Sequence, residues 1–275
     1  MRSVLRASFV ILGAILLSAL VIRASDGVRV PGSGLFAGIG ISQVSRCGQG
    51  MMFLDISGGG LCVDTYEASA GSGCPYRDPR SALETQINLG APNCVPESVP
   101  NARPWTNVPV HQAEALCARA GKRLPTALEW YRAAIGTPDR TDGPCVLSRV
   151  GASRAEETGH GRCISSSGVQ DMVGNVWEWV AESVEDGMLG NRRMPETGYV
   201  VEIAADGIAS KTAAEPDAVF NGDYASFDAS GVRGIFRGGF WGMAEKAGIY
   251  AVNASVPPTF TGDAIGFRCV RMVGG

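Results

Sequence analysis

Four short blocks rich in glycine, arginine and aromatic residues occur in a fixed order along this chain. They are residues 120–130 (AGKRLPTALEW), 174–179 (GNVWEW), 236–241 (FRGGFW) and 266–271 (GFRCVR). One tryptophan-rich hexamer would constrain the fold little. Four ordered blocks that extend from residue 120 to residue 271 constrain it strongly, because a fold must accommodate all of them at once.

In that order, the blocks resemble those of the formylglycine-generating enzyme, or sulfatase-modifying factor, family. The resemblance implies a variant of the C-type lectin fold, which is an irregular, loop-rich α+β fold with few short helices and short antiparallel strands. Composition agrees, because 37 glycines and 15 prolines suit a fold dominated by loops. With 275 residues, of which 45% are hydrophobic, the chain can bury the core of one large domain. We place this domain at residues 47–275.

The N-terminus has the pattern of an export signal. Arg2 and Arg6 precede an uncharged apolar run over residues 7–22. Residues 1–24 are therefore predicted to be a signal peptide or an uncleaved N-terminal membrane anchor, and residues 25–46 a linker. Either alternative places the domain in the periplasm or outside the cell, with an anchor as its only membrane contact. A formal net charge of −3 without a basic stripe argues against a nucleic-acid partner.

The eight cysteines indicate a disulfide framework. None forms Cys-x-x-Cys and the chain has two histidines, His111 and His160, so a zinc site is not expected. An even number of scattered cysteines in an exported chain is typical of disulfides, with free thiols as the alternative. Proximity in sequence suggests three pairs: Cys47–Cys62, Cys74–Cys94 and Cys145–Cys163. The family resemblance implies the fourth, Cys117–Cys269.

Several local elements are readable from pattern alone. Residues 51–56 and 61–68 flank three glycines and predict a hairpin. Residues 70–105 predict a pinned surface loop. Residues 111–120 predict a helix that ends at Gly121.

A second helix is predicted after Pro125. Thr126 and Glu129 form a capping box, in which each side chain bonds the other's backbone amide. Its buried side is expected to carry Leu128, Tyr131 and Ala134. Further strands are expected at residues 199–204, 235–241 and 266–272.

Residues 171–178 (DMVGNVWE) are the candidate metal site. Calcium takes six to eight oxygen ligands from carboxylates and carbonyls. The family resemblance implies calcium ligands at four positions: side-chain oxygens from Asp171 and Glu178, and backbone oxygens from Gly174 and Val176. In the alternative interpretation, Asp171 caps a turn and Glu178 pairs with an arginine.

The family's catalytic residues are missing. In the formylglycine-generating enzymes, two cysteines that follow the Arg-Gly-Gly block bind copper and activate oxygen. Those positions fall on Met243 and Gly248 here, and no cysteine occurs between Cys163 and Cys269. Thiolates are the natural ligands of monovalent copper, so copper is not expected and no residue is assigned a catalytic role. The related iron enzymes carry their histidine ligands on an additional helical domain, which has no counterpart in this sequence.

Two functions remain. The first is an exported, calcium-stabilised domain without formylglycine-generating activity, which binds a peptide, glycan or protein partner on the loops at residues 70–105 and 182–234. The alternative is an exported oxidoreductase of the same superfamily. Such an enzyme would act on a small molecule, as the siderophore-maturation branch does, or on a protein cysteine.

Overall fold

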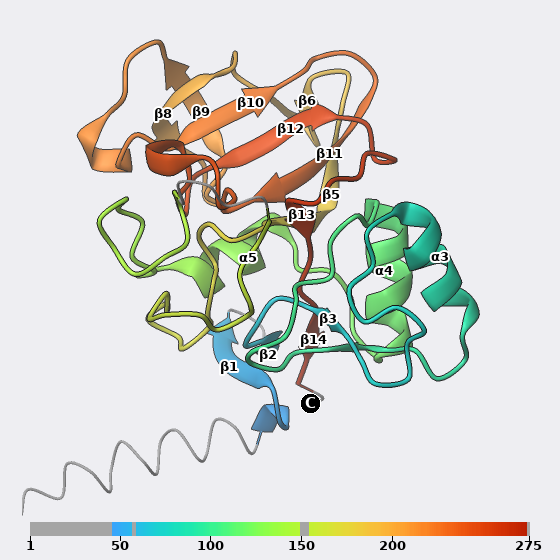
Figure 1. Ribbon diagram of the computed structural model, residues 1–275. Coiled ribbons are helices and arrows are strands. Elements are labelled where there is room, and N and C mark those ends of the chain that lie inside the picture. Colours follow the sequence, from blue (N-terminus) through green and yellow to red (C-terminus); the bar gives the residue numbers. More distant parts are fainter. Residues whose placement is uncertain (1–45, 57–58, 149–153, 274–275) are drawn as a thin grey trace, which may run out of the picture. The chain divides into compact units, whose positions relative to one another are not determined.

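The computed structural model describes residues 46–56, 59–148 and 154–273 (Figure 1). The predicted signal peptide or anchor and nearly all of the predicted linker lie outside these residues. The described part of the chain contains no helix that is long and apolar enough to cross a bilayer. This part has three α-helices: α3 (Ala82–Gly90), α4 (Val110–Arg119) and α5 (Ala127–Ala134). Irregular segments join its strands. The predicted loop-rich α+β fold is confirmed.

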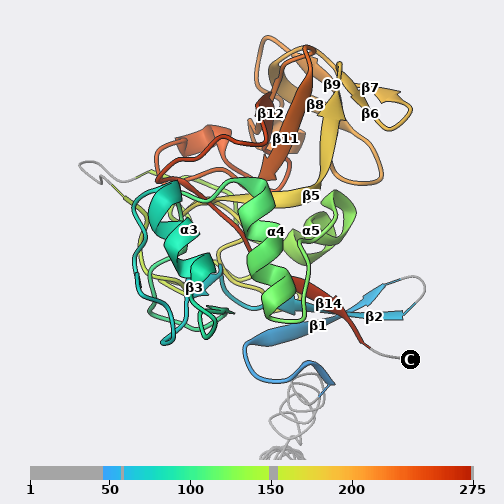
Figure 2. The same ribbon diagram turned by 90° about the vertical axis from the view of Figure 1, so that its right-hand side faces the viewer.

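The larger sheet occupies the C-terminal half of the domain (Figures 1 and 2). Its strands are ordered β7-β6-β5-β11-β12-β10-β8-β9, and β13 pairs with β5. Most neighbours are antiparallel, but β10–β12 and β13–β5 are parallel. The bounds are β5 (Trp177–Glu185), β6 (Met188–Leu189), β7 (Arg192–Arg193), β8 (Gly198–Ile203), β9 (Ala209–Ala213), β10 (Tyr224–Phe227), β11 (Val232–Arg237), β12 (Val252–Val256) and β13 (Ile265–Gly266).

A smaller sheet combines β1 (Met51–Ile56), β2 (Gly59–Asp64) and β14 (Val270–Met272). The predicted hairpin is confirmed as β1–β2, although β2 ends at Asp64 rather than at residue 68. The predicted strand at 266–272 is two strands, β13 and β14, which pair with different sheets. The predicted strand at 235–241 ends early, at Arg237, because Gly238 and Gly239 adopt φ of 94° and 86°.

Helix α4 agrees with prediction, and Gly121 follows it at a φ of 67°. The capping box of α5 is also confirmed: Glu129 N donates to Thr126 Oγ1 at 3.2 Å, and Thr126 N donates to Glu129 Oε2 at 2.8 Å. The expectation that Leu128 is buried was wrong, since it is 37% exposed. Trp130 takes the core position instead, because its indole both fills the interior and reaches a buried hydrogen-bond acceptor.

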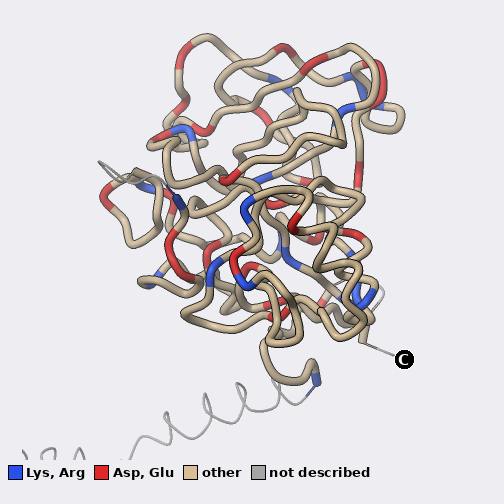
Figure 3. Tube along the Cα trace, turned by 45° about the vertical axis from the view of Figure 1, so that its right-hand side comes forward, with Lys and Arg blue, Asp and Glu red and all other residues tan. Residues whose placement is uncertain are grey.

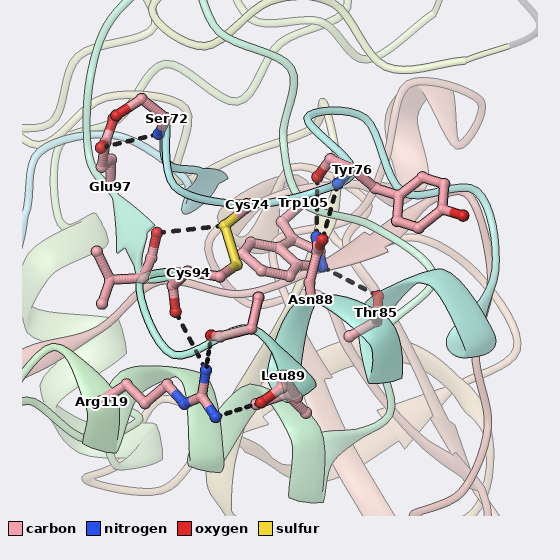
Figure 4. The surroundings of a disulfide bond; sticks show 12 residues. Ser72, Cys74, Tyr76, Thr85, Asn88, Leu89, Cys94, Glu97, Trp105 and Arg119 are labelled. Carbon is pink, nitrogen blue, oxygen red and sulfur yellow. Dashed lines mark hydrogen bonds between the residues drawn. A yellow bond between two sulfur atoms is a disulfide. The ribbon is translucent and has the colours of Figure 1, made fainter.

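The segment over residues 70–105 is more ordered than the predicted loop. It contains α3 and β4 (Pro96–Glu97), and β4 pairs with β3 (Ser69–Ala70). Helix α3 lies beside α4 in both views (Figures 1 and 2). Arg119 of α4 donates to the carbonyl oxygens of Leu89, Ala91 and Cys94, so its guanidinium fixes the end of α3 (Figure 4).

All eight cysteines lie within the described residues, and all four predicted disulfides are present. They are Cys47–Cys62, Cys74–Cys94, Cys117–Cys269 and Cys145–Cys163. The third joins α4 to the segment before β14 across 152 residues. In the chain-entropy model, closing a loop of that length stabilises the folded state by about 4–5 kcal/mol.

Strand β5 separates the two largest clusters of the apolar core. Successive residues of a strand point to opposite faces. Trp177 and Trp179 pack with α4 and Phe267, whereas Val180 and Val184 pack with α5 and the smaller sheet. Glu178 therefore faces α5, from within an apolar interior.

Candidate functional site

The carboxylate of Glu178 lies at the centre of a buried ion pair. Its Oε2 accepts from Trp130 Nε1 at 2.7 Å and from Arg268 Nε at 2.6 Å. Its Oε1 accepts from Arg268 Nη2. All three side chains are buried. The arginine pairing considered for Glu178 as an alternative to calcium is therefore present in the structure.

Arg268 also holds three chain segments together. Its Nη1 donates to the carbonyl oxygen of Asp64, at the end of β2, at 3.0 Å. Its Nη2 donates to the carbonyl oxygen of Gln170 at 2.9 Å. Because Cys269 is joined to Cys117 of α4, the position of Arg268 is fixed by covalent and hydrogen bonds together.

Two more buried carboxylates lie beside this pair. Glu67 accepts from Asn175 Nδ2 at 2.7 Å and from Val176 N at 3.3 Å, so it orders the turn before β5. Asp171 accepts from Gly159 N at 2.5 Å. Burial raises the pKa of Glu67 well above its ordinary value, and the charges of Asp171 and Glu178 raise it further. Burial likewise raises the pKa of Asp171 to about 6.

Three carboxylates thus share one guanidinium, and the cluster needs further positive charge. Protons can supply that charge, because burial in an apolar interior raises the pKa of a carboxyl group, and the group then takes up a proton. A cation could also supply it, but both oxygens of Glu178 are already hydrogen-bonded. In the residues that the structure describes, no three His, Cys, Asp or Glu side chains are arranged to hold a metal ion. Two of the four predicted ligands, those of Gly174 and Val176, are backbone oxygens, and calcium binding at Asp171, Gly174, Val176 and Glu178 stays a prediction.

The third block joins the same network through Arg237. This buried side chain donates to four carbonyl oxygens, those of Ala127, Asp206, Gly207 and Ile249. Its guanidinium lies 4.9 Å from the centroid of a Trp130 ring, within the range of a cation–π contact. Burial lowers the pKa of Arg237 to about 10.

All four blocks therefore meet around one tryptophan, Trp130. Roles for Glu67, Trp130, Arg237 and Arg268 were not predicted from the sequence. Three of them stand inside the quoted blocks, and that placement was the one signal available. Glu67 lies outside the blocks, in the segment after β2.

Residues 146–273 match the family model described as "Sulfatase-modifying factor enzyme 1-like domain". This part of the chain is a sulfatase-modifying-factor domain. Hercynine oxygenase from Mycobacterium tuberculosis is 27% identical over 160 residues, which cover 54% of this chain and 32% of that protein. Hercynine oxygenase from Mycolicibacterium smegmatis is 33% identical over 98 residues, which cover 31% of this chain and 23% of that protein. The chain thus spans a third or less of the length of these curated relatives.

Solved structures are similar over more of the chain but at low identity. PvdO from Pseudomonas aeruginosa is 17% identical with a TM-score of 0.44, over 78% of this chain and 80% of that one. The M1 variant of the Major Tropism Determinant is 17% identical with a TM-score of 0.45, over 82% of this chain and 52% of that one.

Within the sulfatase-modifying-factor domain, Met243 and Gly248 stand at the two positions that correspond to the family's copper-binding cysteines, and both are closely packed against neighbouring side chains. Met243 is partly buried between two apolar clusters. A Cβ atom added at Gly248 would lie 1.9 Å from Asp223 Oδ1 and 2.3 Å from Asp223 Oδ2. Asp223 is fully buried and accepts from Tyr250 N at 2.7 Å, so its carboxyl group is held in place. A cysteine side chain at position 248 would require the Asp223 carboxyl group to move, and the residues present do not fit a copper site.

The two histidines lie on the surface. His111 is exposed on α4, and His160 is exposed in the loop that contains Gly159. Acidic and basic residues are interspersed along the described chain (Figure 3).

Proposed function

We propose that this protein is a ligand-binding domain of the sulfatase-modifying-factor type that lacks copper-dependent formylglycine chemistry. The packing of Gly248 against Asp223 carries the proposal. Copper-dependent oxidation of a cysteine needs two thiolates to hold monovalent copper. One of the two positions has no room for a side chain, and the other carries a thioether.

No other cysteine is available as a replacement. The thiolate is the metal-binding form, and a cysteine in a disulfide cannot provide it. All eight cysteines of the chain are in disulfides. Restoring copper chemistry would require both a new cysteine and a rearrangement of the Asp223 carboxyl group.

The ligand in this proposal is a peptide, a glycan or a protein partner outside the cytoplasm. Lectin-like folds carry variable loops on a rigid base, and ligand-binding residues are concentrated on such loops. The segment over residues 70–105 suits this role, since Cys74–Cys94 and Arg119 hold it on the domain. Export and stabilisation by calcium belong to the same proposal.

The test is mass spectrometry of a cysteine-containing sulfatase-motif peptide after incubation with protein, monovalent copper and reductant under air. We expect the cysteine mass to persist, as in a sample without protein. The Met243→Cys/Gly248→Cys variant should also leave it unchanged, because Asp223 occupies the space of the second thiolate. Formation of the aldehyde by the wild-type protein would refute the proposal.

An oxidoreductase acting on a small molecule or a protein cysteine is the second candidate, and the curated relatives named hercynine oxygenase favour it. It is tested by incubating the protein with hercynine, a thiol, ferrous iron and oxygen. Protein-dependent oxygen consumption with a sulfur-containing product would replace the non-catalytic proposal. We expect neither, because the two histidines are exposed and lie on separate elements.

A further inference from the structure

An open cavity of about 440 Å³ lies beside the scaffold formed by residues 70–105. Five charged side chains line it: Arg80, Arg103, Arg154, Asp78 and Asp263. The lining thus holds three guanidinium groups and two carboxylates, and a third carboxylate, that of Glu157, lies 3.9 Å from Arg103 outside the lining. The buried ion pair of Glu178 and Arg268 is not part of its lining.

The arginines of this cavity are only partly neutralised. One oxygen of Asp78, Oδ2, accepts from both Arg80 at 3.2 Å and Arg154 at 3.4 Å. Arg103 donates from Nη1 to the carbonyl oxygen of Ala155 at 2.8 Å, and its nearest carboxylate oxygen is 3.9 Å away, on Glu157. Asp263 makes no ion pair within the described residues, and it is exposed. Among the described residues, these bonds leave guanidinium N–H groups of Arg80, Arg103 and Arg154 for a ligand.

The turn that carries Asp78 and Arg80 is fixed at both ends. Before it, Asn88 exchanges two 2.8 Å hydrogen bonds with the backbone of Tyr76 (Figure 4). After it, Arg80 N donates to Glu84 Oε2 at 2.5 Å, and Ser81 caps α3. These hydrogen bonds fix the turn to α3 at both of its ends.

The segment that carries Arg103 is fixed in the same way. Its neighbour Trp105 donates from Nε1 to Thr85 Oγ1 of α3 at 3.0 Å (Figure 4). The backbone N of Trp105 donates to the carbonyl oxygen of Ala68 at 2.7 Å. Because both rims are held on α3, ligand binding here would cost little ordering of the chain.

We propose that this cavity binds a ligand through a carboxylate group. The inference rests on the proposed binding role and names the chemistry of the ligand. Guanidinium groups present planar pairs of donors that match a carboxylate. Asp78 and Asp263 repel a phosphate or sulfate dianion more strongly than a singly charged carboxylate, so the carboxylate is the favoured anion.

The test is calorimetric titration of the full chain with four probes. They are acetate, a capped peptide with one glutamate, the same peptide with glutamine, and inorganic phosphate. We expect both carboxylate probes to bind more tightly than the glutamine peptide and phosphate. Tighter binding of the glutamate peptide than of acetate would identify a peptide as the source of the carboxylate, and equal binding would identify a small free acid.

Variants locate the binding. We expect Arg154→Gln and Arg103→Gln each to weaken binding of the glutamate peptide by about tenfold, since each removes a charge-assisted hydrogen-bond donor. Asp263→Asn should strengthen binding, because it removes a repelling charge. Arg140→Gln is the matched control, because Arg140 is an exposed arginine paired with Asp142 outside this cavity.

Three results would overturn the inference: no binding of either carboxylate probe, equal binding of the glutamine peptide, or binding that the Arg154 and Arg103 variants leave unchanged. Arg154→Gln is decisive if Arg103→Gln fails to fold, because Arg154 is exposed and its one ion pair among the described residues is the 3.4 Å contact with Asp78. Peptide binding that neither arginine affects would leave the proposed binding role intact and reject only this cavity. Aldehyde formation would reject the proposed function but would not change the effect of the Arg154 and Arg103 variants on peptide binding.

Discussion

Replacing Gly248 by alanine tests directly whether the family's second copper-ligand position is closed. The added methyl group would lie 1.9 Å from Asp223 Oδ1, far inside any carbon–oxygen contact. Asp223 cannot move without cost, because its side chain is buried and accepts from Tyr250 N at 2.7 Å. Alanine contributes no thiol, so the substitution measures the available space alone.

The magnitude follows from two contributions. Overpacking a filled interior costs about 1–3 kcal/mol. Displacing the carboxyl group leaves the Tyr250 amide without its acceptor, which costs about another 1–3 kcal/mol. We therefore expect Gly248→Ala to lower the free energy of unfolding by about 2–6 kcal/mol. In a domain of this size the Tm should fall by at least about 4 °C.

The assay is urea and thermal unfolding with the disulfides intact. Gly90→Ala is the control, because a Cβ added at Gly90 has no heavy atom within 4 Å. In an Asp223→Ala background, Gly248→Ala should cost at least about 1 kcal/mol less than in the wild type, since contacting residues are energetically coupled. If Gly248→Ala unfolds like Gly90→Ala, or if the Asp223 background makes no difference, position 248 is open and the argument against copper fails.

Three further predictions concern the buried cluster. Arg268→Met should lower the free energy of unfolding by about 3–5 kcal/mol, because it leaves Glu178 charged and unpaired; a loss below about 1 kcal/mol in urea unfolding would contradict this. The pKa of Asp171 is raised to about 6 in the folded state, so the folded protein holds a proton on Asp171 more tightly than the unfolded chain does. Protonation of Asp171 therefore stabilises the fold at low pH, and this contribution is lost as pH rises from about 4 through 6. Asp171→Asn should flatten that part of the Tm-against-pH curve, and an unchanged slope would contradict the assignment. Because stabilisation by calcium belongs to the proposed function, we expect a calcium chelator to lower the Tm and Asp171→Ala to abolish that fall; an unchanged Tm would show that the pairing of Glu178 with Arg268 replaces the cation.

Local patterns predicted the elements whose partners are close in sequence. The capping box of Thr126 and Glu129 needs two residues three positions apart, and both of its hydrogen bonds are present. Three disulfides joined cysteines that are neighbours along the chain. The fourth, Cys117–Cys269, came from family resemblance, because no local pattern relates residues that far apart.

Helix α3 shows why other elements escaped prediction. Its inward face carries Thr85 and Asn88, whereas Leu83 and Ile87 are exposed. An apolar stripe is the usual signal of a packed helix, and here the packed side is polar. The helix is held by hydrogen bonds to Trp105 and Tyr76, and sequence alone does not show such bonds.

The Asp171–Glu178 segment shows the same limit at the candidate site. Two carboxylates around a glycine turn are compatible with a cation and equally with a buried ion pair. The ion pair depends on the position of Arg268, which is 90 residues from Glu178 along the chain but lies against its carboxylate. The sequence contained both residues and gave no means of pairing them.

The four sequence blocks explain why the family can be recognised although its copper-binding cysteine pair is absent. Trp130, Glu178, Arg237 and Arg268 come one from each block, and all are buried in a single network. A buried arginine or glutamate is costly unless its partners are present, so these residue types are required by the fold whatever the domain does. Positions 243 and 248 lie outside the blocks, and their side chains can change without breaking the network. Agreement in the blocks is therefore evidence about folding, and the reaction must be judged at Met243, Gly248 and Asp223.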